Sequence, residues 1–152
     1  MYINDGRTSY STNQKRQLLS ALYALEEKQP AINTPEDVVA QFLKYRNRRK
    51  EYFFSLSVDN KNQLLKKHEI SRGTVDQTAV FPQEVIKATL FCSGSGIILG
   101  HNHPGGDPTP SEQDKTLTWK IQEGAKFLGL RLLDHVVVAK YGHFSFQEHG
   151  LI

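Results

Sequence analysis

Hydrophobic residues recur at helical spacing in the first part of this chain. A stripe of leucines predicts an amphipathic helix over Thr12 to Lys28 that docks on another surface: Leu18, Leu19, Leu22 and Leu25. Thr34 and Pro35 predict the start of a second helix, because threonine is a favoured N-cap and proline fits the first helical turn. Residues 1–11 are polar and predicted to be disordered, and residues 30–33 are predicted to be a linker.

From Glu51 onward the hydrophobic pattern changes to that of strands. Residues 52–58 and 63–70 predict a hairpin around the turn at Asp59. The short apolar run from Ile97 to Gly100 predicts a buried strand. The same reasoning predicts further helices and strands: helices over residues 82–91 and 111–127, and strands over residues 130–139 and 144–147. Helices and strands in this order indicate an α/β chain, built as a mixed α+β sheet flanked by helices.

Length and composition are those of a single globular domain with an N-terminal extension. The chain has 152 residues, of which 38% are hydrophobic, enough for one core. We assign that core to a domain over residues 34–152, and residues 1–33 to a tail and leucine-rich helix. Cys92 is the single cysteine and cannot form an internal disulfide. Apolar runs such as residues 136–139 are too short to span a bilayer, so we expect a cytoplasmic protein without a membrane segment.

The net charge of +3 is concentrated in a basic cluster after the second predicted helix: Lys44, Arg46, Arg48, Arg49 and Lys50. Cations at a helix C-terminus suit the negative end of the helix dipole, so a solvated helix end is one explanation. Clustered arginines also bind phosphate and carboxylate groups, so contact with DNA or an acidic protein is the other. The sequence leaves both explanations open.

Two histidines and an aspartate carry the most specific chemistry. His101 and His103 are two positions apart, so their side chains leave an extended segment on the same face. Asp114 follows a stretch rich in proline and glycine that can turn the chain back. Two imidazoles and a carboxylate suit one Zn²⁺ ion, and three protein ligands leave a position for water, as in catalytic zinc sites. The pattern therefore predicts a catalytic metal site.

Ser111 and Asp114 also have a structural explanation. Ser-x-x-Asp ahead of an apolar helix is the pattern of a capping box. Both roles are compatible, with Ser111 capping the helix while Asp114 faces the metal. The coincidence of this pair with two histidines at a strand end favours a site over a cap alone.

These residues form a motif that resembles a known family. The pattern His101-x-His103-Pro104, followed by Ser111 and Asp114, is similar to the signature of JAMM (JAB/MPN-plus) metalloproteases. The whole string between the first histidine and the aspartate is similar to the RadC branch in particular.

The resemblance to RadC proteins extends over residues 34–151 and includes the segment around His135. Gly105 and Gln83 depart from it, because RadC proteins usually have serine and arginine at these positions. The helix-hairpin-helix region of longer RadC proteins has no counterpart in this sequence.

The resemblance implies the JAB/MPN (cytidine-deaminase-like) fold and a zinc-dependent hydrolase. It implies that His101, His103 and Asp114 hold one Zn²⁺ ion, that Glu51 is the general base, and that Ser111 stabilises the oxyanion. The implied reaction is cleavage of a peptide or isopeptide bond in an unknown protein or peptide substrate. The RadC family also carries a DNA-repair label, so a nucleic-acid-binding or nuclease accessory protein is the alternative.

Two further expectations concern residues outside this motif. We expect His135 to form a hydrogen-bonded structural pair with Asp134 rather than to support the metal site. An exposed leucine stripe would favour a homodimer through the N-terminal helix.

Overall fold

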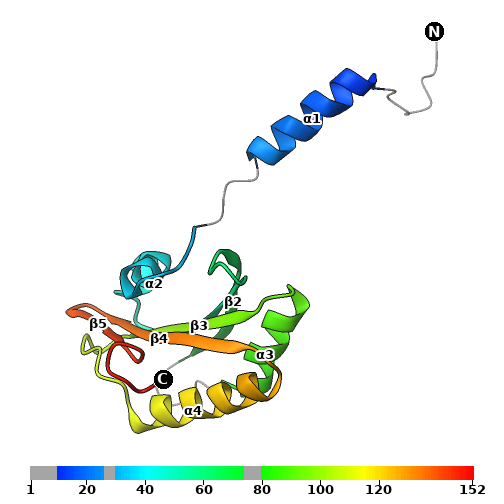
Figure 1. Cartoon of the computed structure of the whole chain (residues 1–152). Coiled ribbons are helices and arrows are strands. Elements are labelled where there is room, and N and C mark those ends of the chain that lie inside the picture. The colour runs from blue at the N-terminus through cyan, green and yellow to red at the C-terminus, as the bar shows by residue number, and fades with distance from the viewer. Residues whose placement is uncertain (1–9, 26–29, 74–79) are drawn as a thin grey trace.

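The computed structural model describes residues 10–25, 30–73 and 80–152. Within these residues a mixed five-stranded sheet has the order β2-β1-β3-β4-β5, which confirms the predicted architecture (Figure 1). Its strands are β1 (Glu51–Val58), β2 (Leu64–Gly73), β3 (Gly96–His103), β4 (Arg131–Ala139) and β5 (Gly142–Ser145). The helices are α1 (Thr12–Leu25), α2 (Pro35–Phe42), α3 (Pro82–Phe91) and α4 (Glu112–Phe127), with a short 3-10 helix, η1 (Leu43–Tyr45), after α2. Residues 1–9 of the predicted tail and the predicted helix end at Lys28 lie outside the described residues.

Side chains that alternate along the strands build a core on each face of the sheet. Phe54 and Ile98 belong to the core under α2, which also contains Phe42. Phe53 and Leu99 belong to the core under α3 and α4 on the opposite face (Figure 1). Because successive residues of a strand point to opposite faces, odd positions of β3 face α4 and even positions face α2. This alternation places both histidines of the motif on the α4 face.

Strand β3 continues past the predicted end at Gly100. Its parallel pairing with β4 extends through His101 to His103, which lies opposite Ala139. His101 and Asn102 are fully buried. The hydrophobic pattern predicted too short a strand because His101 and Asn102 are polar. Strands on both sides nevertheless hold these two residues inside the sheet. The two histidines are therefore part of a central strand.

The last strand is displaced from its predicted position at residues 144–147. Gly142 has φ of +144°, a conformation open to glycine, and it pairs directly with Ala139 after the turn. After Ser145 the chain leaves the sheet, because the carboxylate of Asp134 accepts hydrogen bonds from the Ser145 hydroxyl at 2.7 Å and the Gln147 amide at 3.0 Å. These contacts end β5 at Ser145.

The segment predicted as a linker takes part in the domain. The amide of Ile32 donates to the carbonyl of Asn62 at 2.9 Å, and the amide of Leu64 donates to the carbonyl of Pro30 at 3.0 Å. The side chain of Ile32 is buried in the α2-side core. The packed domain thus includes residues from Pro30 onward.

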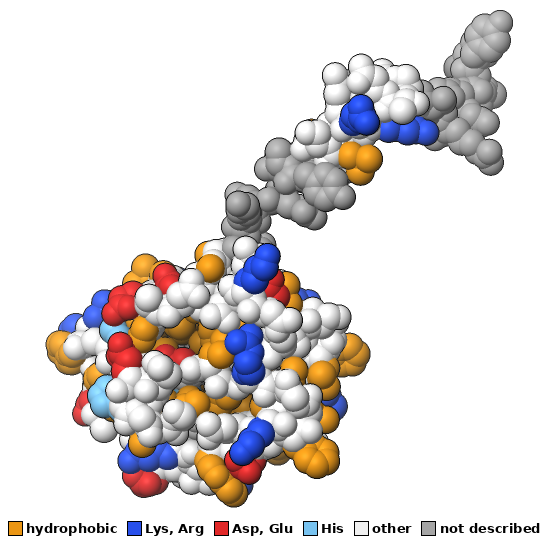
Figure 2. All heavy atoms as spheres, in the orientation of Figure 1, with side chains coloured by type: hydrophobic (Ala, Val, Ile, Leu, Met, Phe, Trp, Pro, Cys, Tyr) orange, Lys and Arg blue, Asp and Glu red, His pale blue; other side chains and the backbone are white. Residues whose placement is uncertain are grey.

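Helix α1 presents hydrophobic and basic side chains on its surface (Figure 2). Leu18 is 45% exposed and Leu19 is 53% exposed. The side chains of Leu22 and Leu25, which complete the predicted stripe, lie outside the described ones. The homodimer contact through this helix stays a prediction. Across the described residues, no helix is both long and apolar enough to cross a membrane.

Candidate metal centre

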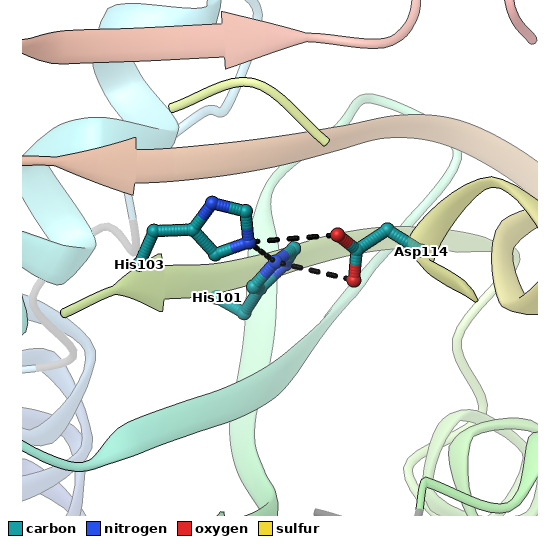
Figure 3. A group of neighbouring side chains, drawn as sticks. All are labelled: His101, His103 and Asp114. Carbon is teal, nitrogen blue, oxygen red and sulfur yellow. Dashed lines mark hydrogen bonds and ion pairs between the residues drawn. The ribbon is translucent and has the colours of Figure 1, made fainter. Parts of the chain in front are cut away.

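Strand β3 and the start of α4 bring the three predicted metal ligands together. His101 and His103 extend from β3 towards Asp114 in the first turn of α4 (Figure 3). The two Nε2 atoms are 2.9 Å apart, and they lie 3.4 Å and 3.5 Å from Oδ1 and Oδ2 of Asp114, respectively. One ligand atom from each residue lies within 4.8 Å of the others. This group can hold a metal ion.

The predicted capping box is confirmed at the start of α4. The hydroxyl of Ser111 accepts a hydrogen bond from the Asp114 amide at 3.1 Å, and the Asp114 carboxylate accepts one from the Ser111 amide at 2.7 Å. The same hydroxyl donates to Oδ2 of Asp114 at 2.7 Å. The cap therefore fixes the orientation of the carboxylate that faces the histidines.

Asp114 and His103 each shift the pKa of the other. Burial by itself would raise the pKa of Asp114, but hydrogen bonds with His101 and His103 outweigh it and hold that pKa well below the usual range. Burial would lower the pKa of His103, but its hydrogen bonds with Asp114 and the Asp107 carbonyl raise it. The pocket thus stabilises positive charge beside the carboxylate.

Glu51 lies on the same face as the histidines, at the start of the adjacent strand. Strand β1 pairs with β3 so that Phe53 is opposite His101, and Glu51 is two residues before Phe53. Glu51, His103 and Asp114 line one cavity of about 610 Å³. Burial, opposed in part by His101, raises the pKa of Glu51. A half-buried carboxyl with a raised pKa is suited to accept a proton.

Asn102 holds the backbone on both sides of Glu51. Its side chain points to the face opposite the histidines and is fully buried. Its Oδ1 accepts from the amide of Tyr52 at 2.7 Å, and its Nδ2 donates to the carbonyl of Lys50 at 3.0 Å. The residue between the two metal-motif histidines therefore ties β3 to the segment that carries Glu51.

The expected pair of His135 and Asp134 forms through the backbone of His135 and not through its imidazole. Asp134 accepts from the backbone amide of His135 at 2.7 Å, but the imidazole itself contacts His101 and Thr118. Burial, and next the charge of His101, lowers the pKa of His135 well below 6.5. Sequence reasoning missed Thr118, which lies one helical turn after Asp114 in α4. It also missed the contact of His135 with His101, because only the pairing of β4 beside β3 brings these two histidines together.

Two arginines of the basic cluster donate hydrogen bonds to backbone carbonyls within the domain. Arg46 donates to the carbonyls of Ala139 at 2.7 Å and Lys140 at 2.8 Å, which ties η1 to the turn between β4 and β5. Arg48 donates to the carbonyl of Lys44 at 3.3 Å. On the face in Figure 2, Lys and Arg side chains are spread out, with Asp and Glu among them. Contact of the cluster with DNA stays a prediction.

The two departures from the RadC pattern lie at exposed positions. A Cβ at Gly105 would have no atom within 4 Å, so the serine usual in the family would fit there. Gln83 is exposed in the first turn of α3. Neither departure alters the contacts among the three predicted metal ligands.

A mixed sheet between two helical layers, with a His-His-Asp group at one strand and the following helix, defines a JAB-type domain. Residues 32–151 match the RadC-like JAB domain family, and the chain belongs to this family. It is 39% identical over 129 residues to a "UPF0758 protein" from Methanosarcina mazei, a match that covers 84% of this chain and 56% of that relative. A protein of the same name from Histophilus somni is 41% identical over 133 residues, with 86% of this chain and 60% of the relative covered. The chain thus spans less than two thirds of the length of these relatives.

Proposed function

We propose that this protein is a zinc-dependent hydrolase of the JAMM type, a metallopeptidase that cleaves a peptide or isopeptide bond. The observation that carries the proposal is the convergence of His101, His103 and Asp114, two of which line one cavity together with Glu51. Membership in the RadC-like JAB domain family supports it. The protein or peptide substrate would enter this cavity, and the single cysteine is consistent with a cytoplasmic location.

The donor set fits zinc. The Asp107 carbonyl can only accept a hydrogen bond, so its 2.9 Å contact with Nδ1 of His103 places the proton on that nitrogen. Binding of a metal ion would displace the proton that Nε2 of His103 shares with Asp114, so that Nε2 becomes a ligand beside His101 and Asp114. Imidazole nitrogens and a carboxylate are preferred zinc ligands, and three of them leave a position open. When bound, zinc lowers the pKa of a water molecule to about 7 and polarises a carbonyl oxygen.

Glu51 and Ser111 would carry out the proton transfer and the charge stabilisation. The carboxylate of Glu51 accepts a proton from the attacking water and returns it to the leaving amine, so the bond to nitrogen breaks as a neutral amine leaves. The hydroxyl of Ser111 donates a hydrogen bond to the developing oxyanion. That hydroxyl donates to Asp114 in the resting structure, so this role requires it to rotate towards the substrate.

The metal is tested before the reaction. Protein purified without added zinc should contain about one equivalent of zinc, and His103→Ala should lose it because one of three ligands is gone. Elemental analysis of both proteins decides the point. Zinc absent from both proteins, even after incubation with zinc, would overturn the proposal.

The reaction is tested with peptide, isopeptide and DNA substrates. We expect cleavage of an amide bond that Glu51→Gln abolishes while zinc content stays unchanged, because Glu51 is not a ligand in the proposed site. Cleavage of DNA without cleavage of any amide would instead favour a nuclease. Binding to DNA alone, weakened when Arg48 and Arg49 are replaced but unchanged in Glu51→Gln, would favour the accessory role.

A further inference from the structure

A chain of three hydrogen bonds connects two of the proposed ligands, Asp114 and His101, behind the proposed metal site. The hydroxyl of Thr118 lies 2.6 Å from the carbonyl oxygen of Asp114 and 2.6 Å from Nδ1 of His135. Nε2 of His135 lies 2.8 Å from Nδ1 of His101. Thr118 is 2% exposed, and both histidines are fully buried. The contacts that join Thr118 of α4, His135 of β4 and His101 of β3 are therefore shielded from solvent.

The direction of each hydrogen bond in this chain follows from the bond between Thr118 and the Asp114 carbonyl. A carbonyl oxygen only accepts, so the single hydroxyl proton of Thr118 is donated to Asp114. The Thr118 oxygen must then accept from Nδ1–H of His135. A neutral imidazole has one N–H, and that of His135 is donated to Thr118, so Nε2 of His135 accepts from Nδ1–H of His101.

We propose that Thr118 and His135 are positioning residues that hold His101 in the tautomer with Nδ1 protonated and Nε2 free for the metal. The inference rests on the proposed function of the site. A histidine ligand must present an unprotonated nitrogen, and the group that holds its other nitrogen selects which one that is. Thr118 fixes the tautomer of His101 through His135, whereas the Asp107 carbonyl fixes that of His103 directly.

Removal of the Thr118 hydroxyl should reverse the direction of the hydrogen bond between His135 and His101. Thr118→Val keeps the shape of the side chain but leaves Nδ1 of His135 without its acceptor. His135 then favours the tautomer protonated at Nε2, because that proton can still find an acceptor in Nδ1 of His101. This exchange would move the proton of His101 to Nε2, the nitrogen proposed to bind the metal.

Thr118→Val and Thr89→Val form a matched pair for the test. Thr89 is also fully buried, and its hydroxyl is 2.9 Å from that of Ser57, away from the metal site. Zinc affinity is measured by competition with a chromogenic chelator. We expect Thr118→Val to weaken zinc binding about 10- to 100-fold, the usual effect of losing a hydrogen bond behind a metal ligand. Thr89→Val should leave the affinity unchanged, and Thr118→Ser, which keeps the hydroxyl, should retain it.

Nitrogen-15 NMR of the histidine rings gives a second readout, which needs no activity and no variant. In the zinc-loaded wild-type protein, His101 and His135 should both be protonated at Nδ1. Protonation of His135 at Nε2 would overturn the inference even if Thr118→Val failed to fold. Equal losses of affinity in Thr118→Val and Thr89→Val, or no loss in either, would overturn it while the wild type still binds zinc. A wild-type protein that binds no zinc would overturn the proposed function itself.

Discussion

At Gly100 the α2-side core lies directly against the strand that carries the two histidines of the proposed metal site. It precedes His101 in β3, and the ring of Phe42 from α2 covers it. A Cβ at position 100 would lie 2.3 Å from both Cε2 and Cζ of that ring. Because carbon atoms in contact are about 3.5–4.0 Å apart, Gly100→Ala requires the ring or the strand to move by roughly 1.2 Å or more.

The surroundings of Phe42 leave little room for that movement. Phe42 is fully buried, its ring centroid is 5.3 Å from that of Phe54, and the ammonium of Lys67 lies 4.5 Å from its centroid. Overpacking of this kind costs about 1–3 kcal/mol, and we expect Gly100→Ala to fall in the upper half of that range. Urea denaturation measures the free energy of unfolding. A displaced β3 should also weaken zinc binding through His101.

Two further variants test whether the clash with Phe42 is the cause. Gly105→Ala is the control, because a Cβ there meets nothing within 4 Å; its effect should stay within about 0.5 kcal/mol. Phe42→Leu removes the clashing ring edge, so the double variant should be more stable than the sum of the single changes predicts, by about 1 kcal/mol or more. A loss in Gly100→Ala no larger than in Gly105→Ala, or strict additivity with Phe42→Leu, would refute the reasoning.

Three other predictions follow from the site. Glu51→Gln should abolish hydrolysis yet raise the free energy of unfolding at neutral pH. Burial raises the pKa of Glu51, so its ionised form is less favourable in the folded chain, and in thermal melts the gain should vanish below the ordinary pKa of 4.5. Asn102→Ala leaves the amide of Tyr52 and the carbonyl of Lys50 without a partner, at about 1–3 kcal/mol, and unchanged hydrogen exchange at the Tyr52 amide would contradict this. Zinc at a hundredfold excess over its Kd should stabilise the wild type by about 2.7 kcal/mol, but not His103→Ala, as read from urea midpoints.

Several elements could be predicted because their signals are local. The capping box at Ser111 and Asp114 lies within a single helical turn, and α3 occupies the predicted residues 82–91. The spacing of His101 and His103 places them on one face of any strand, whatever its neighbours. The errors lie where non-local pairing overrides a local pattern, as at the polar end of β3 and the start of β5.

The sequence by itself therefore determined the type of protein and its three candidate ligands, because residue spacing and helix capping act over a few positions. Only the tertiary structure decided which side chains support those ligands. The pairing of β1 with β3 places Glu51 on the face of the histidines, and the pairing of β4 with β3 places His135 behind His101. Both depend on strand order, which brings together residues far apart in the chain and leaves no trace in the local hydrophobic pattern.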